Sequence, residues 1–161
     1  MRLSGYSDYA LRTLMLAAAL APSRTVTISE VARVFGIAES HMRKIVHELA
    51  RAGFLRSRRG RRGGFGLGRS ASEIRVAEVL RATEADFALV ECQRASGSCC
   101  PLMGRCRLER LLERARAAFF AELERVTLAD LVPAPSSFLR DLGLEPQKRA
   151  PSLGAAAGLR S

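Results

Sequence analysis

Four cysteines in one short segment are the residues of this chain whose types and spacing could do chemistry. Cys92, Cys99, Cys100 and Cys106 are separated by Gly, Ser and Pro residues that favour a loop. Three thiolates on a loop suit a soft metal, either zinc or an iron–sulfur cluster. The segment offers no histidine to complete a four-ligand shell. In a shell of three thiolates and one weaker ligand, the position of the weaker ligand is open to attack by a signal molecule, which is what a sensor requires.

Composition limits the class of protein and its partners. The chain has 161 residues with a net charge of +10, which allows one packed domain with an appended element and favours a polyanionic partner such as nucleic acid. No apolar run reaches the ~18 residues that a membrane span needs. We therefore expect a cytoplasmic protein with no membrane partner. Cysteines there stay reduced, so metal or redox chemistry is expected rather than a disulfide framework.

Hydrophobic periodicity predicts the elements that must position these cysteines. Ser7 can cap a first helix, and Thr27 a second one, with Glu30 at the capping-box spacing. Gly36 supplies a turn before the third helix. The three predicted ranges are 8–21, 28–35 and 39–52. Two helices joined by a short glycine turn are the helix-turn-helix pattern of DNA-binding proteins.

An arginine- and glycine-rich segment follows the third predicted helix. No acidic residue occurs from Arg51 to Ser72, and residues 58–64 contain only arginine and glycine. The segment predicts a two-stranded wing, in which arginine supplies charge and glycine lets the backbone approach a phosphate or a minor groove. The expected DNA contacts lie on the third helix and on the wing: Ser40, His41, Arg43, Lys44, Arg58, Arg59, Arg61 and Arg62.

The fold class predicted is mainly α, a winged helix-turn-helix with a small β-hairpin wing and a long dimerisation helix. Residues 1–84 form the DNA-binding domain, with a fourth helix over 71–84, and residues 85–107 form the cysteine loop. Residues 108–131 hold the long helix and a short capped helix. The apolar stripe of the long helix exceeds what a small domain can cover, so a two-fold homodimer is expected. Residues 132–161 are rich in Pro, Ser, Ala and Gly and are predicted to be disordered.

These motifs together resemble the iron–sulfur winged-helix repressors typified by NsrR and IscR. The resemblance covers about residues 1–131. Its carriers are Tyr6-Ser-Asp-Tyr-Ala-Leu-Arg12, Thr27-Ile-Ser-Glu-Val-Ala32, Arg59-Gly-Arg-Arg-Gly-Gly64, Val90-Glu-Cys92, Cys100-Pro-Leu, Cys106-Arg-Leu108 and Thr127-Leu-Ala-Asp-Leu131. The chain is most similar to the NsrR branch, because the IscR branch has a histidine where this chain has Glu109.

The resemblance implies a transcriptional repressor rather than an enzyme. It implies a homodimer whose binding to a palindromic operator in double-stranded DNA is controlled by a 4Fe–4S cluster sensitive to nitric oxide. The implied ligands are Cys92, Cys100 and Cys106, with Asp8 from the other subunit. Cys100 is preferred because Pro-Leu follows it, and Cys99 remains the alternative.

Several alternatives remain open at the level of the sequence. Asp8 has an ordinary explanation, because an acid in the first turn of a helix is favoured by the dipole and can pair with Arg12 at i+4. The cluster could be 2Fe–2S. The same fold could sense iron–sulfur supply or redox state, or zinc could staple a DNA-binding protein that has no sensing role. A small redox enzyme has the least support, because no catalytic base or Ser/His/Asp set is recognisable.

Overall fold

The computed structural model describes residues 2–58, 60, 63–94 and 100–144. This part of the chain is mainly helical, with one two-stranded antiparallel sheet, as predicted. The elements are α1 (Gly5–Leu20), α2 (Ile28–Phe35), α3 (Glu39–Arg51), β1 (Leu55–Arg58), β2 (Gly64–Leu67), η1 (Ala71–Glu73), α4 (Val76–Thr83), η2 (Glu91–Gln93), α5 (Arg107–Glu124), α6 (Leu128–Leu131) and α7 (Pro135–Asp141). Among the described helices, none has the length and apolar character to cross a membrane.

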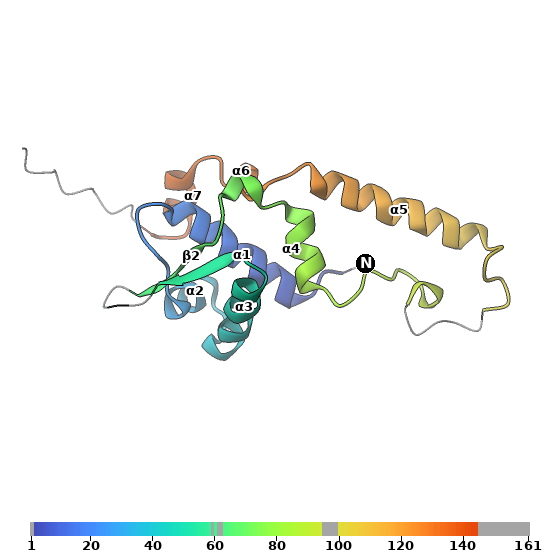
Figure 1. Cartoon of the computed structure of the whole chain (residues 1–161), viewed down its shortest axis with the longest axis horizontal. Helices are drawn as coiled ribbons and strands as arrows, with labels where there is room; N and C mark the ends of the chain where they lie inside the picture. The colour runs from blue at the N-terminus through green and yellow to red at the C-terminus, as the bar shows by residue number, and fades with distance from the viewer. Residues whose placement is uncertain (1, 59, 61–62, 95–99, 145–161) are drawn as a thin grey trace, which may run out of the picture.

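Helix α1 lies at the centre of the fold, and α3, α4, α6, α7 and β2 all contact it. Figure 1 places α2 and α3 on one side of α1 and α6 and α7 on the other. Leu14 and Leu16 are both fully buried, although residues two apart in a helix point in nearly opposite directions. The helix is therefore apolar on more than one face, as expected for a helix that is covered on several sides.

Helix α1 begins three residues earlier than predicted. Ser4, not Ser7, is the N-cap, and its Oγ accepts a hydrogen bond from the Ser7 backbone N–H at 3.2 Å. Ser7 is fully buried, and its hydroxyl lies 2.8 Å from Thr83 Oγ1 at the end of α4. Its partner is 76 residues away in the sequence, so local pattern could not reveal this role.

The helix-turn-helix forms as predicted. Thr27 caps α2 by accepting from the Glu30 N–H at 3.2 Å, and Gly36 closes the helix in the left-handed conformation at φ 65°. Glycine adopts this conformation without the strain that a Cβ would cause. The inward face of α3 is buried, as expected, through Met42, Ile45, Val46 and Leu49.

The hairpin pairs Leu55 with Leu67 at one end and Arg58 with Gly64 at the other. Phe65 is buried, and its backbone exchanges two hydrogen bonds with Val26, at 2.9 and 2.8 Å. The segment before α2 therefore pairs with β2 through an antiparallel bridge, which holds the wing against the helix-turn-helix. Three of the arginines expected to contact DNA lie outside the described residues: Arg59, Arg61 and Arg62.

The single helix predicted over 71–84 is wrong. The chain forms η1 and then α4, with Arg75 between them in an extended conformation. The interruption allows a backbone pairing with the segment after α5: the Val76 N–H donates to Val126 O at 3.0 Å and the Leu128 N–H to Ile74 O at 2.8 Å. These distant bonds hold α6, whose predicted Thr127 cap is present, against the domain.

The predicted disorder of the tail is wrong for residues 132–144. Pro135 occupies the first turn of α7, where its missing N–H costs nothing. Val132, Leu139 and Leu144 are buried, and α7 packs against α1. The Pro and Ser content suggested a tail, but a few apolar residues are enough to attach it to the core. Residues 145–161 lie outside the described part of the chain.

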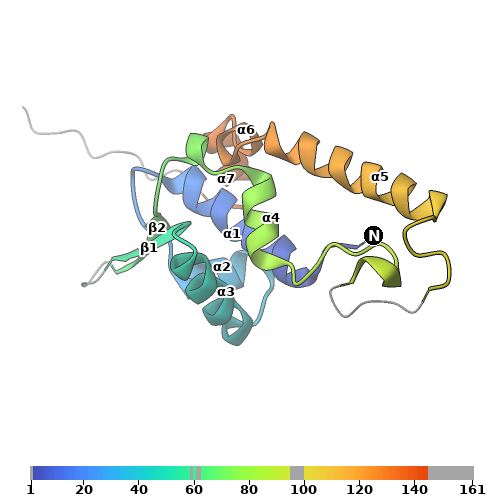
Figure 2. The ribbon, with the colours of Figure 1, turned by 45° about the vertical axis from the view of Figure 1, so that its right-hand side comes forward.

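Helix α5 extends away from the domain, as both ribbon views show (Figure 2). None of its residues is buried. Leu108 and Leu111 are 56% and 51% exposed, so its apolar stripe is left uncovered within one protomer. The prediction of a dimerisation helix depends on this stripe.

Candidate nucleic-acid interface and cysteine loop

The outer face of α3 carries the side chains predicted to reach DNA. Ser40, His41, Arg43 and Lys44 are all exposed, while the opposite face of the helix is buried. Arg43 pairs with Glu39 at 3.2 Å, with 68% of the arginine side chain exposed. Such surface pairs contribute little to stability, so Arg43 can exchange its carboxylate for a phosphate. The structure therefore brings the four helix residues together on one accessible face.

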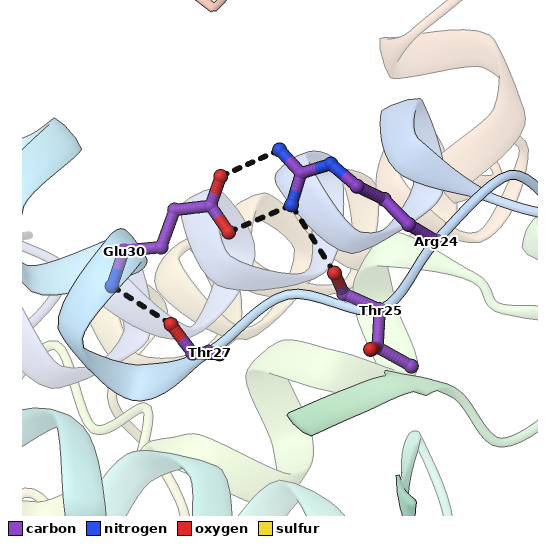
Figure 3. Close-up of polar contacts among 4 residues, drawn as sticks. All are labelled: Arg24, Thr25, Thr27 and Glu30. Atoms are coloured by element: carbon purple, nitrogen blue, oxygen red, sulfur yellow. Dashed lines mark hydrogen bonds and ion pairs between the residues drawn. The ribbon is translucent and has the colours of Figure 1, made fainter. Parts of the chain in front are cut away.

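A bidentate ion pair fixes the turn that precedes the helix-turn-helix (Figure 3). Arg24 Nη1 and Nη2 lie 2.8 and 2.6 Å from the two carboxylate oxygens of Glu30, and Nη1 also donates to Thr25 O at 3.2 Å. The sequence marked Glu30 only as a capping-box residue. Its carboxylate bonds Arg24 instead, which joins the turn after α1 to the first turn of α2. The arginine hydrogen bonds outweigh partial burial and lower the pKa of Glu30.

The cysteine loop places three thiols between α4 and α5. Cys92 lies in η2, Cys100 opens the turn that follows, and Cys106 is the N-cap of α5. All three are half-buried, and none forms a disulfide. Cys99, the alternative ligand, lies outside the described residues.

Burial raises the pKa of the Cys92 thiol, and negative charge on Glu109, Cys100 and Cys106 raises it further. Within the described ranges, no three His, Cys, Asp or Glu side chains are grouped as a metal site requires. The thiols fit a soft metal by their chemistry, and a metal would have to displace the Cys92 proton on binding.

Asp8 lies in the first turn of α1. The start of α1 is on the side of the domain from which the cysteine loop extends (Figure 1). Its carboxylate pairs with Arg12 at 2.7 Å, and both side chains are about half exposed. The i+4 pair expected from the sequence is thus present. Within the described residues, Asp8 belongs to no group of three His, Cys, Asp or Glu side chains that could hold a metal.

A hydrogen-bond network that sequence reasoning missed joins the start of α1 to the end of α4. The Ser4 N–H and hydroxyl donate to Glu84 Oε1 at 2.7 and 2.9 Å, beside the Ser7–Thr83 contact. Burial disfavours the charged form of Glu84, but hydrogen bonds from Ser7 and Ser4 outweigh it and lower its pKa. The network connects the turn that carries Asp8 to the point where the chain leaves for the cysteine loop. With partners 80 residues apart, no local signal could have revealed it.

The family model of Rrf2, described as an iron-dependent transcriptional regulator, matches residues 3–134. The chain belongs to the Rrf2 family. IscR of T. potens superposes with a TM-score of 0.66 at 21% identity, covering 83% of this chain and 87% of that one. CymR, the global cysteine regulator of B. subtilis, gives 0.67 at 22% identity over 83% and 97% of the two chains. The oxidized form of Staphylococcus aureus CymR gives 0.65 at 25% identity over 83% and 98%.

Membership of the Rrf2 family identifies the protein as a transcriptional regulator, so the expectation that it is not an enzyme is confirmed. The superpositions confirm the winged-helix fold. Rrf2 regulators bind DNA and are typically dimeric. Because both IscR and CymR share this fold, the family alone does not separate the NsrR branch from the others.

The Arg24–Glu30 pair predicts a pH-dependent contribution to stability. The pKa of Glu30 lies below its ordinary value of 4.5 in the folded state, so its contribution is complete above pH 4.5 and is lost as the pH falls through the folded value. Glu30→Gln should therefore lower the free energy of unfolding at pH 7, and its deficit against the unaltered chain should shrink below pH 4.5. Urea unfolding at several pH values measures this.

Glu48→Gln is the matched control, because Glu48 forms an exposed pair with Arg51 at 3.1 Å. It should change the free energy of unfolding at pH 7 by no more than ~1 kcal/mol. Equal deficits for the two variants at every pH would show that the Arg24 pair is an ordinary surface contact.

Proposed function

We propose that this protein is a cytoplasmic, homodimeric repressor that reads a palindromic operator with α3 and the wing. The observation that carries the proposal is the exposed face of α3, where Ser40, His41, Arg43 and Lys44 stand opposite a fully buried face. The +10 net charge favours the same polyanionic partner. Two-fold symmetry implies half-sites about 34 Å apart, one turn of duplex.

We propose further that the signal is nitric oxide and that the sensor is a 4Fe–4S cluster. The support is the resemblance to NsrR-like repressors, the iron-dependent description of the family and three thiols on one loop. Cys92, Cys100 and Cys106 would hold the cluster, with Asp8 of a second subunit as the fourth ligand. When bound, the cluster would supply an iron atom open to attack at its carboxylate corner, since a carboxylate is a harder ligand than a thiolate.

The route from the sensor to DNA would pass through α1. Its first turn carries Asp8 and is tied to the end of α4 by the Ser4–Glu84 hydrogen bonds, and its length packs against α3. Loss of the bond between subunits would change how two α1 helices are held, and hence how far apart two α3 helices lie. This is a shift in population between two dimer geometries rather than a local change at the DNA face.

Anaerobic purification separates this proposal from the alternatives. A brown protein with iron and sulfide favours a cluster, and a colourless protein with zinc favours a stapled DNA-binding protein. Titration with nitric oxide, then separately with oxygen and peroxide, distinguishes nitric oxide sensing from redox sensing. Repressor activity that responds to cluster loss alone would indicate a sensor of iron–sulfur supply.

Single alanine substitutions test the ligand assignment. Cys92→Ala, Cys100→Ala and Cys106→Ala should each abolish the visible absorption of the anaerobically purified protein, because each removes one of the three thiolates that would hold the cluster. Cys99→Ala is the matched control and should retain iron, sulfide and absorption. If Cys99→Ala loses the cluster and Cys100→Ala keeps it, the middle ligand is Cys99.

The face of α3 is tested by measuring affinity for an operator selected from a random-sequence pool. Lys44→Ala should weaken operator binding, by about 1–3 kcal/mol if it contacts a base edge, or with a log–log salt slope smaller by about 0.9 if it contacts a phosphate. Arg51→Ala is the control, because Arg51 is exposed in the last turn of the same helix and pairs with Glu48. An operator affinity and salt slope left unchanged by Lys44→Ala would place this face of α3 outside the operator contact.

Two variants separate the proposed role of Asp8 as a cluster ligand from its observed ion pair with Arg12. Asp8→Ala and Arg12→Ala both remove the same 2.7 Å ion pair, but only the first removes a carboxylate. Asp8→Ala should therefore change the absorption spectrum and the rate of reaction with nitric oxide, while Arg12→Ala leaves both unaltered. Should the two variants behave alike, Asp8 serves only the helix.

A further inference from the structure

A hollow of about 570 Å³ beside the hairpin is lined by four arginines: Arg24, Arg56, Arg58 and Arg69. It lies between the end of α1, the turn that follows, the two strands and the start of η1. Among the described residues, no Asp or Glu lines it, and neither α2 nor α3 contributes to it. The hollow is therefore distinct from the cysteine loop and from the exposed face of α3, and it shares only Arg58 with the expected DNA contacts.

Two of these arginines are held in place by contacts behind the hollow. Arg24 is fixed by the bidentate pair with Glu30 and by Thr25 O. Arg69 pairs with Glu78, donates to Glu73 O at 3.2 Å and stacks over the Phe54 ring at 5.2 Å. Each has one carboxylate partner, so these two guanidinium groups are neutralised and ordered before any ligand arrives.

The other two arginines have no carboxylate partner in the described part of the chain. Arg56 and Arg58 are exposed on β1, and the strand register sets them opposite Gly66 and Gly64. A Cβ built on Gly66 would meet no atom within 4 Å, so open space lies over that residue. The absence of a side chain at Gly66 leaves the hollow open beside Arg56.

We propose that this hollow binds a phosphate group. Four guanidinium groups, less the two paired carboxylates, leave a charge of +2, which matches the −1.5 to −2 of a phosphate monoester at about pH 7. The planar arginine fork matches phosphate oxygens in a bidentate manner. The volume exceeds that of a single phosphate and lies within the range of small-molecule sites, about 300–1,000 Å³, so the molecule that carries the phosphate also has room.

The same chemistry has two possible sources: the backbone of the DNA beside the half-site, or a free phosphorylated small molecule. Neither source depends on the cluster or on nitric oxide. The first measurement is thermal unfolding of the full chain in inorganic phosphate against chloride at equal ionic strength. A ligand that binds only the folded state raises the unfolding temperature, and phosphate should do so.

Gly66→Val is the decisive variant, because it fills the hollow while keeping all four arginines. Valine suits a strand and meets open space at this position, so the fold should be retained. The variant should lower the affinity for phosphate by about tenfold or more, as should Arg56→Ala through the loss of a charge-assisted hydrogen bond. Arg140→Ala removes an exposed arginine of α7 and should leave the affinity unchanged.

Binding of a mixed-sequence duplex then identifies the source. If DNA supplies the phosphate, Gly66→Val should reduce the log–log salt slope by about 0.9. If a free molecule supplies it, the slope stays unchanged while the phosphate-dependent shift in unfolding temperature is lost. If phosphate raised the unfolding temperature equally in the unaltered chain, Gly66→Val and Arg56→Ala, the proposal would be overturned. The effect would then come from the net charge of +10 and not from binding in the hollow. Neither measurement requires iron or an operator, so its failure is separate from failure of the repressor function.

Discussion

Burial of α1 on several sides is the constraint on which the rest of the structure depends. Its residues contact α3, α4, α6, α7 and β2, so none of these five elements can move far without disturbing the same core. Loss of a large buried side chain such as Leu14 or Leu16 would leave a cavity shared by several elements. The helix also places the two proposed binding features at its two ends: Asp8 in its first turn, and the arginine hollow beside its last.

The connections made by α1 differ in kind. At its start, the hydrogen bonds of Ser4 and Ser7 reach the end of α4. At its end, the ion pair of Arg24 with Glu30 and the backbone pairing of Val26 with Phe65 reach α2 and the wing. Hydrogen bonds and an ion pair thus hold both ends of α1, and apolar packing buries its middle. Directional bonds specify position more sharply than burial alone.

What the sequence could predict follows from how far apart the partners lie. The Thr27 cap, the Gly36 turn, the Asp8–Arg12 pair and the inward face of α3 involve residues a few positions apart, and they were predicted. The break at Arg75, the Ser4–Glu84 bonds and the packing of α7 depend on partners about 50 or more positions away, and local pattern does not predict them. For the candidate site, residue type identified the cysteines and the α3 face, whereas the arginine hollow needed the register of the strands.

Among the described residues, a ring contact and an ion pair hold helix α5 near its C-terminal end. Phe120 packs against Phe87 with ring centroids 4.6 Å apart, and Glu124 pairs with Arg81, while the end that begins at Cys106 is far from these contacts. Fourteen residues of helix separate Cys106 from Phe120, a span of about 21 Å at about 1.5 Å per residue. The helix can thus pivot about the contact between Phe87 and Phe120. A tilt of about 10° there would move Cys106 by about 4 Å over that span, so a small displacement close to α4 corresponds to a large one at the Cys106 end of the helix.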